Sequence, residues 1–334
     1  MKVLNTILID HYEEFEITHL LTKDIPDYSN HQFKGEIMFL LEQYRNCKKS
    51  NTPFIIPRFL KKDMELWEKY FFDLYYEKEE ITFKNINSNF GFIFPKTWKK
   101  RKYSEANDYE NYKDLHTELA KIEPFNTDTI IHFLKYFGGL SLGDTCWSVL
   151  EIYYRISQFR FTFEIWLSLI QENSTKMESI LLDSYMTRIS LIKDTFMNSA
   201  TVLNEDMGEM EKNLEEEYMM EEYKNSTPLE FGINILDQAL GREISEKIQA
   251  GYTFKENKFI FERMIFSLFE LAYDNLAINL SPNTTIANCE YCGSPFQKRH
   301  KSRRFCPPLP GNKTSSCQNA YNNEIKKKQR QTKK

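Results

Sequence analysis

Hydrophobic residues recur every three or four positions over most of the chain, which predicts a mainly α-helical protein. Between residues 175 and 200, Thr175 and Glu178 form a predicted capping box ahead of one apolar face. This face consists of Met177, Leu181, Tyr185, Ile189, Ile192 and Phe196. Similar spacing predicts further helices at 36–47, 63–79, 107–121, 127–137 and 264–280, and two short helices over 229–250. The long helical stretch spans 145–200 and is expected to begin after a cap at Asp144 or Thr145.

Strand-like alternation is confined to two places. Residues 80–94 alternate around Asn87-Ser88-Asn89, and residues 252–263 alternate around Glu256-Asn257, so each predicts a β-hairpin. Glycine and proline number only 11 each in 334 residues, which favours helices over a turn-rich β fold. The predicted fold class is a mainly α-helical body with minor β-hairpins, followed by a small C-terminal zinc module.

Composition places this fold among globular, cytoplasmic proteins. Hydrophobic residues make up 41% of the chain and aromatic residues 15%, which is ample material for a core. The apolar run near the N-terminus ends at Asp10 with no cleavage-site pattern, so no leader is expected. No run of 18 apolar residues exists, so no membrane contact is expected.

Charge is divided unevenly along the chain, although the formal net charge is only −4. Residues 289–334 hold 12 Lys and Arg residues against 2 Glu residues, whereas the remainder is strongly acidic. Nine acidic residues stand between 205 and 222. We therefore expect a helical body over 1–204, an acidic mobile segment over 205–228, a helical continuation over 229–283, and a zinc module with a basic tail over 284–334.

Four of the six cysteines lie close together, at Cys289, Cys292, Cys306 and Cys317. Two residues separate the first pair, a spacing that lets two thiolates reach one tetrahedral metal ion. Gly293 follows the second cysteine and favours the turn that this geometry needs. Sparse, clustered cysteines indicate a structural Zn²⁺ site in a reducing compartment, and a redox pair is the less favoured alternative.

The module carries a further pattern. Cys289-x2-Cys292-Gly293, then Arg303-Arg304-x-Cys306, then Cys317 before a basic helix resembles the CGNR-type zinc fingers and related short bacterial zinc modules. The resemblance covers about 289–330, and it implies a DNA-binding role. The chain departs from the family in the PPLPGNKTSS stretch ahead of Cys317 and in having Ala320 after Asn319.

Basic residues surround the cysteines and would suit a phosphate backbone, since their binding gains from counter-ion release. The candidate contacts are Lys298, Arg299, Lys301, Arg303, Arg304, Lys326, Lys327, Lys328 and Arg330. Ser315 or Ser316 is expected to cap the helix that carries the last four. His300 is expected to be exposed instead of binding metal, and Phe296 and Phe305 are expected to form the small apolar core of the module.

Catalytic patterns are weak. His116-Thr117-Glu118 matches half of a zinc-deaminase signature, but Asn288 stands where the second half requires proline. Only His300 lies between the cysteine pairs, which disfavours an HNH-type nuclease. The favoured function is therefore non-enzymatic nucleic-acid binding, with DNA preferred over RNA and a regulatory role open. The alternative is a protein-interaction factor, oligomeric or docked on a nucleic-acid-processing or defence complex of a bacterium or phage, in which zinc is structural.

Overall fold

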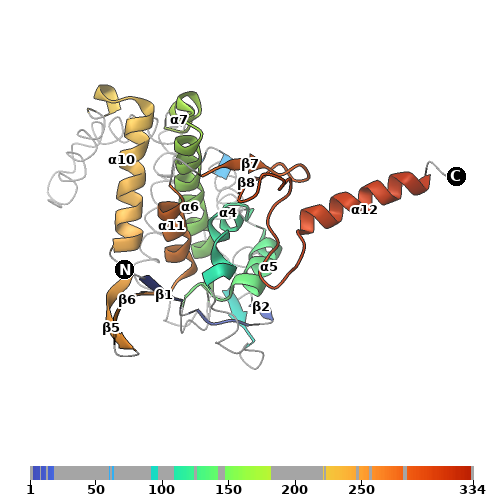
Figure 1. Ribbon diagram of the computed structural model, residues 1–334, viewed down its shortest axis with the longest axis horizontal. Helices are drawn as coiled ribbons and strands as arrows, with labels where there is room; N and C mark the ends of the chain where they lie inside the picture. The colour runs from blue at the N-terminus through green and yellow to red at the C-terminus, as the bar shows by residue number, and fades with distance from the viewer. Residues whose placement is uncertain are drawn as a thin grey trace, which may run out of the picture. The chain divides into compact units, whose positions relative to one another are not determined.

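The computed structural model describes residues 3–7, 9–12, 14–18, 60, 62–63, 92–96, 109–123, 126–141, 147–181, 221, 223–245, 248–255, 258–280 and 284–331. This part of the chain is mainly helical with small sheets, so the predicted fold class is confirmed (Figure 1). No helix within it has the length and apolar character that crossing a membrane requires.

The chain divides into two compact units, each assembled from separate stretches. One contains Met1–Thr18, Phe92–Val149 and Ala239–Lys334, and the other contains His19–Gly91 and Leu150–Gln238. The cysteine cluster belongs to the first unit. The four-part organisation proposed from charge and composition stays a prediction.

The first unit contains the three small sheets. Strand β1 (Val3–Ile7) pairs in parallel with β6 (Lys258–Ile265), which pairs antiparallel with β5 (Gln249–Lys255). Strand β3 (Phe92–Pro95) lies between β2 (Phe15–Thr18) and β4 (Trp147–Ser148), both antiparallel to it. Strands β7 (Ile286–Asn288) and β8 (Pro295–Gln297) form a hairpin.

The hairpin predicted over 252–263 is confirmed, because Lys255 pairs with Lys258 across the expected turn. The other predicted hairpin, at 80–94, falls mostly on residues outside the described part. Its end, β3, takes its partners from distant segments, Phe15–Thr18 and Trp147–Ser148. The parallel β1–β6 pair was not predicted, because period-2 alternation in one segment carries no information about a partner so far along the chain.

Helices of the first unit support the cysteine cluster. A short 3₁₀ turn, η3 (Tyr109–Tyr112), precedes α4 (Leu115–Leu119), and α5 (Thr127–Phe137) begins after Asn126, whose side chain accepts a hydrogen bond from the Thr129 N–H. The predicted bounds of α5 are confirmed. Helix α11 (Leu268–Asn279) is capped by Ser267 and packs against α4. The buried leucines of the two helices are Leu115 and Leu119 in α4, and Leu268, Leu271 and Leu276 in α11.

The second unit contains α6 (Val149–Ile170, whose first residue belongs to the first unit), α7 (Ser174–Leu181) and most of α10 (Pro228–Leu240), which a π-helical turn at Gly241–Ser245 extends. Helix α6 begins later than predicted, because Trp147 and Ser148 pair with β3. The capping box predicted at Thr175 is wrong. Asn173 caps α7 instead, its side chain accepting a hydrogen bond from the Lys176 N–H at 2.9 Å.

Several predictions concern residues outside the described part. They are the helix at 36–47, nearly all of the helix at 63–79, the continuation of the long helix over 182–200, and the acidic run at 205–222 apart from Glu221.

Candidate metal centre and its basic helix

The first two cysteines lie in a tight turn directly after β7. The Gly293 N–H donates to the Cys289 carbonyl oxygen at 2.9 Å, and the Cys289 N–H donates to the Ser294 carbonyl oxygen at 2.9 Å. Gly293 has a φ of +74°, a left-handed conformation that glycine adopts without steric cost. The expected role of this glycine is therefore confirmed, and the β7–β8 pairing holds the turn in place.

The other two cysteines come from the following loop and the last helix. Cys306 is buried in the loop, and Cys317 lies in the first turn of α12 (Ser316–Gln331). Ser315 caps this helix, since its hydroxyl accepts a hydrogen bond from the Gln318 N–H. Phe296 is fully buried with Cys289 and Cys306, while Phe305 packs against them, as expected for a small core.

The four sulfurs form a single group whose atoms all lie within 4.8 Å of one another. None of these cysteines is in a disulfide, and the Cys292 and Cys306 sulfurs are 3.5 Å apart. A tetrahedral ion bound by four thiolates at about 2.3 Å places neighbouring sulfurs about 3.8 Å apart. The arrangement therefore fits a four-coordinate metal ion with small adjustments of the side chains.

The electrostatics of the thiols also favour a cation among them. Burial raises the pKa of Cys317, and the nearby sulfurs of Cys292 and Cys289 raise it further, to about 12. Burial also raises the pKa of Cys306, as does the sulfur of Cys292. Burial opposes ionisation of Cys289 too, but backbone N–H groups that point at its sulfur bring its pKa down to about 6. A central divalent ion would offset both the burial and the repulsion between sulfurs that raise the pKa values of Cys306 and Cys317.

A lysine from α4's end contacts the cluster. The Lys121 ammonium group donates to the Cys306 sulfur at 3.3 Å and to the Glu118 carboxylate at 2.6 Å. Burial lowers the pKa of Lys121, but Glu118 and Cys306 outweigh it, so the net shift is upward and the lysine stays charged. Four thiolates and one divalent ion carry a net charge of −2, which this cation partly offsets.

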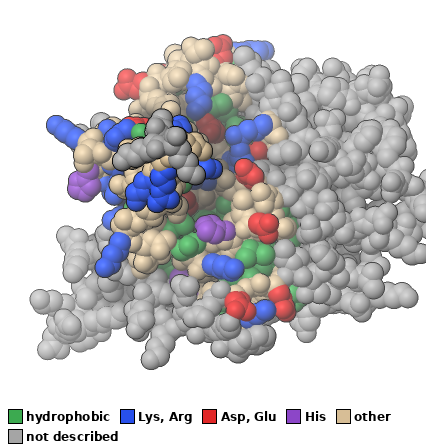
Figure 2. Space-filling view, turned by 90° about the vertical axis from the view of Figure 1, so that its right-hand side faces the viewer, with side chains coloured by type: hydrophobic (Ala, Val, Ile, Leu, Met, Phe, Trp, Pro, Cys, Tyr) green, Lys and Arg blue, Asp and Glu red, His purple; other side chains and the backbone are tan. Residues whose placement is uncertain are grey.

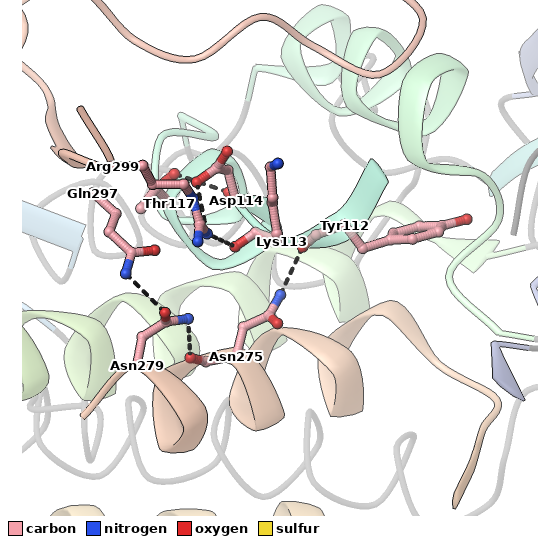
Figure 3. A network of polar contacts seen from close by, with 8 residues as sticks. All are labelled: Tyr112, Lys113, Asp114, Thr117, Asn275, Asn279, Gln297 and Arg299. Carbon is pink, nitrogen blue, oxygen red and sulfur yellow. Dashed lines mark hydrogen bonds and ion pairs between the residues drawn. The ribbon is translucent and has the colours of Figure 1, made fainter. Parts of the chain in front are cut away.

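Polar contacts fix the hairpin of the module to α11. In Figure 3 the Gln297 side chain donates to the Asn279 side-chain oxygen, at 2.8 Å. Asn279 in turn donates to the Asn275 carbonyl oxygen at 2.7 Å, and the Asn275 side chain donates to the Tyr112 carbonyl oxygen at 2.7 Å. The Thr284 hydroxyl adds a bond to the Asn279 carbonyl oxygen. The module is thus packed on the helices of its unit instead of hanging from a linker.

Arg299 and Arg304 already have protein partners. Arg299 donates to the Lys113 carbonyl oxygen at 3.1 Å and to the Asp114 carboxylate at 3.3 Å (Figure 3). Arg304 forms a two-pronged ion pair with Glu290, and its guanidinium lies over the rings of Phe305 and Tyr321. Both arginines are nevertheless exposed, so their role as phosphate contacts stays a prediction.

The other predicted phosphate contacts differ in exposure. Lys298 and Arg303 are half-buried, and the buried Nη1 of Arg303 has no hydrogen-bond partner among the described residues. The exposed cations of this remaining set are Lys301, Lys326, Lys327, Lys328 and Arg330. Figure 2, which looks toward the side to which α12 extends, shows Lys and Arg side chains gathered around this helix.

Residues from the weaker motifs stay apart from the cysteine cluster. His300 is exposed, as expected, and is not among the grouped metal-binding side chains. His116 is fully buried, and burial together with the nearby Arg299 and Lys121 lowers its pKa to about 3. His11 is buried and lies 2.7 Å from the Tyr112 hydroxyl. Within the described residues, the four cysteines form the one group of His, Cys, Asp and Glu side chains that fits a metal ion.

Sequence reasoning missed the residues that support the module from outside. Lys121 and Asp114 lie far from the cysteines in sequence, Asn279 lies ten residues before Cys289, and each belongs to an ordinary helical pattern. Asn279, a polar residue late in an apolar helix, was the one available signal. Comparisons with protein-family models, with curated proteins and with solved structures found no match for the chain.

Proposed function

We propose that the chain binds nucleic acid through phosphate contacts made by Lys301 and the basic end of α12, with Zn²⁺ as the structural ion that holds both in place. Zinc is the ion chosen because four thiolates in a closed, tetrahedral arrangement are typical of structural zinc sites. An iron–sulfur centre is the other occupant such ligands suit. The resemblance to CGNR-type fingers agrees with DNA as the target, and free thiols agree with a reducing, cytoplasmic compartment.

The main support for the proposal is that a metal ligand and several exposed cations belong to the same helix, α12. Cys317 lies in the first turn of the same helix that exposes Lys326, Lys327 and Arg330 about two and a half to three and a half turns later. An ion bound at Cys317 therefore fixes the start of this basic helix. Clustered exposed cations release counter-ions when they meet phosphates, which favours binding at low salt.

The test is fluorescence-anisotropy titration of duplex and single-stranded probes at several salt concentrations. The variant K326Q/K327Q is compared with K135Q/K224Q, which removes the same charge from exposed lysines elsewhere. We expect K326Q/K327Q to weaken binding and to reduce the salt slope by about 2, while the control binds like wild type. Equal binding by both variants, or no binding by wild type, would overturn the proposal.

Metal dependence is tested separately, because zinc is a distinct part of the proposal. We expect about one zinc per purified chain by elemental analysis, and its loss in C292S, with C47S, a cysteine remote in sequence from the four, as the control. Nucleic-acid binding should be weaker in the variant that has lost its zinc. A colourless protein also separates zinc from an iron–sulfur centre.

A protein partner is the second candidate, and the end of α11 favours it. Ile278 and Leu280 lie two residues apart at the end of α11 and are 52% and 43% exposed, so they leave apolar surface that a partner would cover. A self-associating or partner-bound protein would cover them. Light scattering of wild type and I278D/L280D tests this, and a monomer for both, with no partner-dependent change, would exclude self-association.

A further inference from the structure

One side of α12 faces the module. Cys317, Ala320 and Tyr321 are the half-buried residues of this helix, and the Tyr321 ring packs on Phe305 with centroids 5.1 Å apart. One turn later, Glu324 accepts a hydrogen bond from the Tyr291 hydroxyl at 3.2 Å. At 100° per residue these four positions share one face, which is therefore committed to the module.

The opposite face carries different chemistry. Asn322, Asn323, Lys326 and Arg330 lie about 100–180° around the helix axis from Cys317 and Tyr321, and all four are exposed. No residue of α12 is buried, and Figure 1 shows the helix extending from the module toward the C-terminus. This outward face combines amides with cations, and Lys327 stands beside it.

The dimensions of α12 favour one class of nucleic acid over the others. A 16-residue helix is about 24 Å long and about 10–12 Å across, which fits the ~12 Å width of the B-DNA major groove. The major groove of duplex RNA is too narrow for a helix. Single strands are held mainly by stacking on aromatic rings, and the outward face has none, since Tyr321 is on the other side.

We infer that α12 inserts its outward face into the major groove of duplex DNA and reads base edges there. This inference rests on the proposed nucleic-acid binding and adds the target class and the reading surface. Asn side chains pair with adenine through two hydrogen bonds, and Arg pairs with guanine in the same way. Asn322, Asn323 and Arg330 would therefore give sequence preference, whereas Lys327 would contact phosphates on the rim.

The two faces of α12 have different roles: one attaches the helix to the module, and the other is presented outward. Because Tyr321, Glu324 and Cys317 hold the helix by one side, the opposite side is presented at a fixed rotation. Reading requires such a fixed rotation, since a freely turning helix could not keep amides aimed at base edges. The metal ligand within the helix would thus set the register of the reading side chains as well as the fold of the module.

The experiment selects preferred duplexes from a random pool with the full chain, and then compares one preferred sequence as duplex DNA, single-stranded DNA and duplex RNA. We expect duplex DNA to bind at least tenfold more tightly than the other two. The variant N322A/N323A should reduce the preference for selected over scrambled duplex by about tenfold or more. It should leave binding to the scrambled duplex unchanged, because alanine strengthens the helix and no cation is lost.

Two controls separate reading from charge and stability. N312A alters an exposed asparagine of the module outside α12 and should behave like wild type. K327Q should weaken selected and scrambled duplexes equally. Preference that survives in N322A/N323A, or equal binding to single strands or RNA, would overturn the inference while leaving the proposed function standing. Binding to none of the probes would overturn both, and a concentration-dependent dimer abolished by N322A/N323A would assign this face to a second copy of the chain.

Discussion

Lys121 donates a hydrogen bond to the sulfur of Cys306 from 185 residues away in sequence, at 3.3 Å. This contact joins the end of α4 to the metal ligands and provides positive charge where a tetrathiolate ion site has an excess of negative charge. Together with the Gln297–Asn279 and Arg299–Asp114 contacts, it makes the module part of its unit's packing. The metal is therefore expected to influence the stability of more than the module itself.

The first prediction concerns Lys121 directly. Replacing it in K121M keeps the aliphatic stem but removes the cation, so the thiolates lose a charge-assisted donor. We expect metal affinity to fall about 10- to 100-fold, as is typical when groups behind metal ligands are removed. Competition with a chromophoric chelator measures it. K135M, which alters an exposed lysine on α5, is the control, and equal affinity for the two variants would contradict the role given to Lys121.

The second prediction uses the left-handed backbone at Gly293. A Cβ there would meet no atom within 4 Å, so backbone conformation alone decides the outcome. We expect G293A to destabilise the turn by about 1 kcal/mol and G293V by more, because left-handed geometry penalises a Cβ and penalises β-branching most. G293N should be milder, since asparagine tolerates this conformation.

A metal affinity that decreases from wild type through G293N and G293A to G293V would support this account of the turn. An order that follows side-chain size, with Asn worse than Ala, would point to crowding instead.

The third prediction concerns attachment of the module to α11. Asn279 uses its side chain both to accept from Gln297 and to donate to the Asn275 carbonyl oxygen. In N279A the part-buried partners lose these bonds, which should cost about 1–3 kcal/mol. Hydrogen exchange should rise in β7 and β8 more than in β5 and β6. N312A serves as the control, and a global rise in exchange without this localisation would contradict the attachment.

The fourth prediction concerns acid stability through His116. Its pKa falls from 6.5 to about 3 on burial beside Arg299 and Lys121, so the folded state binds this proton far more weakly than the unfolded state. Between pH 6.5 and pH 3 His116 therefore binds more protons in the unfolded chain, and its contribution to the free energy of unfolding falls as pH falls. The contribution of this one group between pH 6.5 and pH 5 is about 1.5 kcal/mol.

Urea unfolding at several pH values tests this contribution. H116Q should lose less stability over that window than wild type, whereas H132Q, which alters an exposed histidine on α5, should follow wild type. Identical pH dependence in wild type and H116Q would show that the buried imidazole is not the titrating group.

Local pattern was enough to predict much of this protein. Helical periodicity predicted α5 and α11, the Glu256-Asn257 turn predicted the β5–β6 hairpin, and cysteine spacing predicted a four-sulfur site with its glycine turn and serine cap. Each of these features depends on residues a few positions apart, or on ligands whose chemistry leaves few alternatives. Signals of this kind can be recognised within a short stretch of sequence.

Tertiary structure alone decided which distant segments meet. The parallel pairing of β1 with β6, and the insertion of β3 between β2 and β4, join segments whose own sequences specify no partner. The same holds for the partners of the arginines: Arg299 and Arg304 stay exposed, but only the fold pairs them with Asp114 and Glu290. A charge count records how many cations exist, whereas only the fold determines which of them have an acidic neighbour.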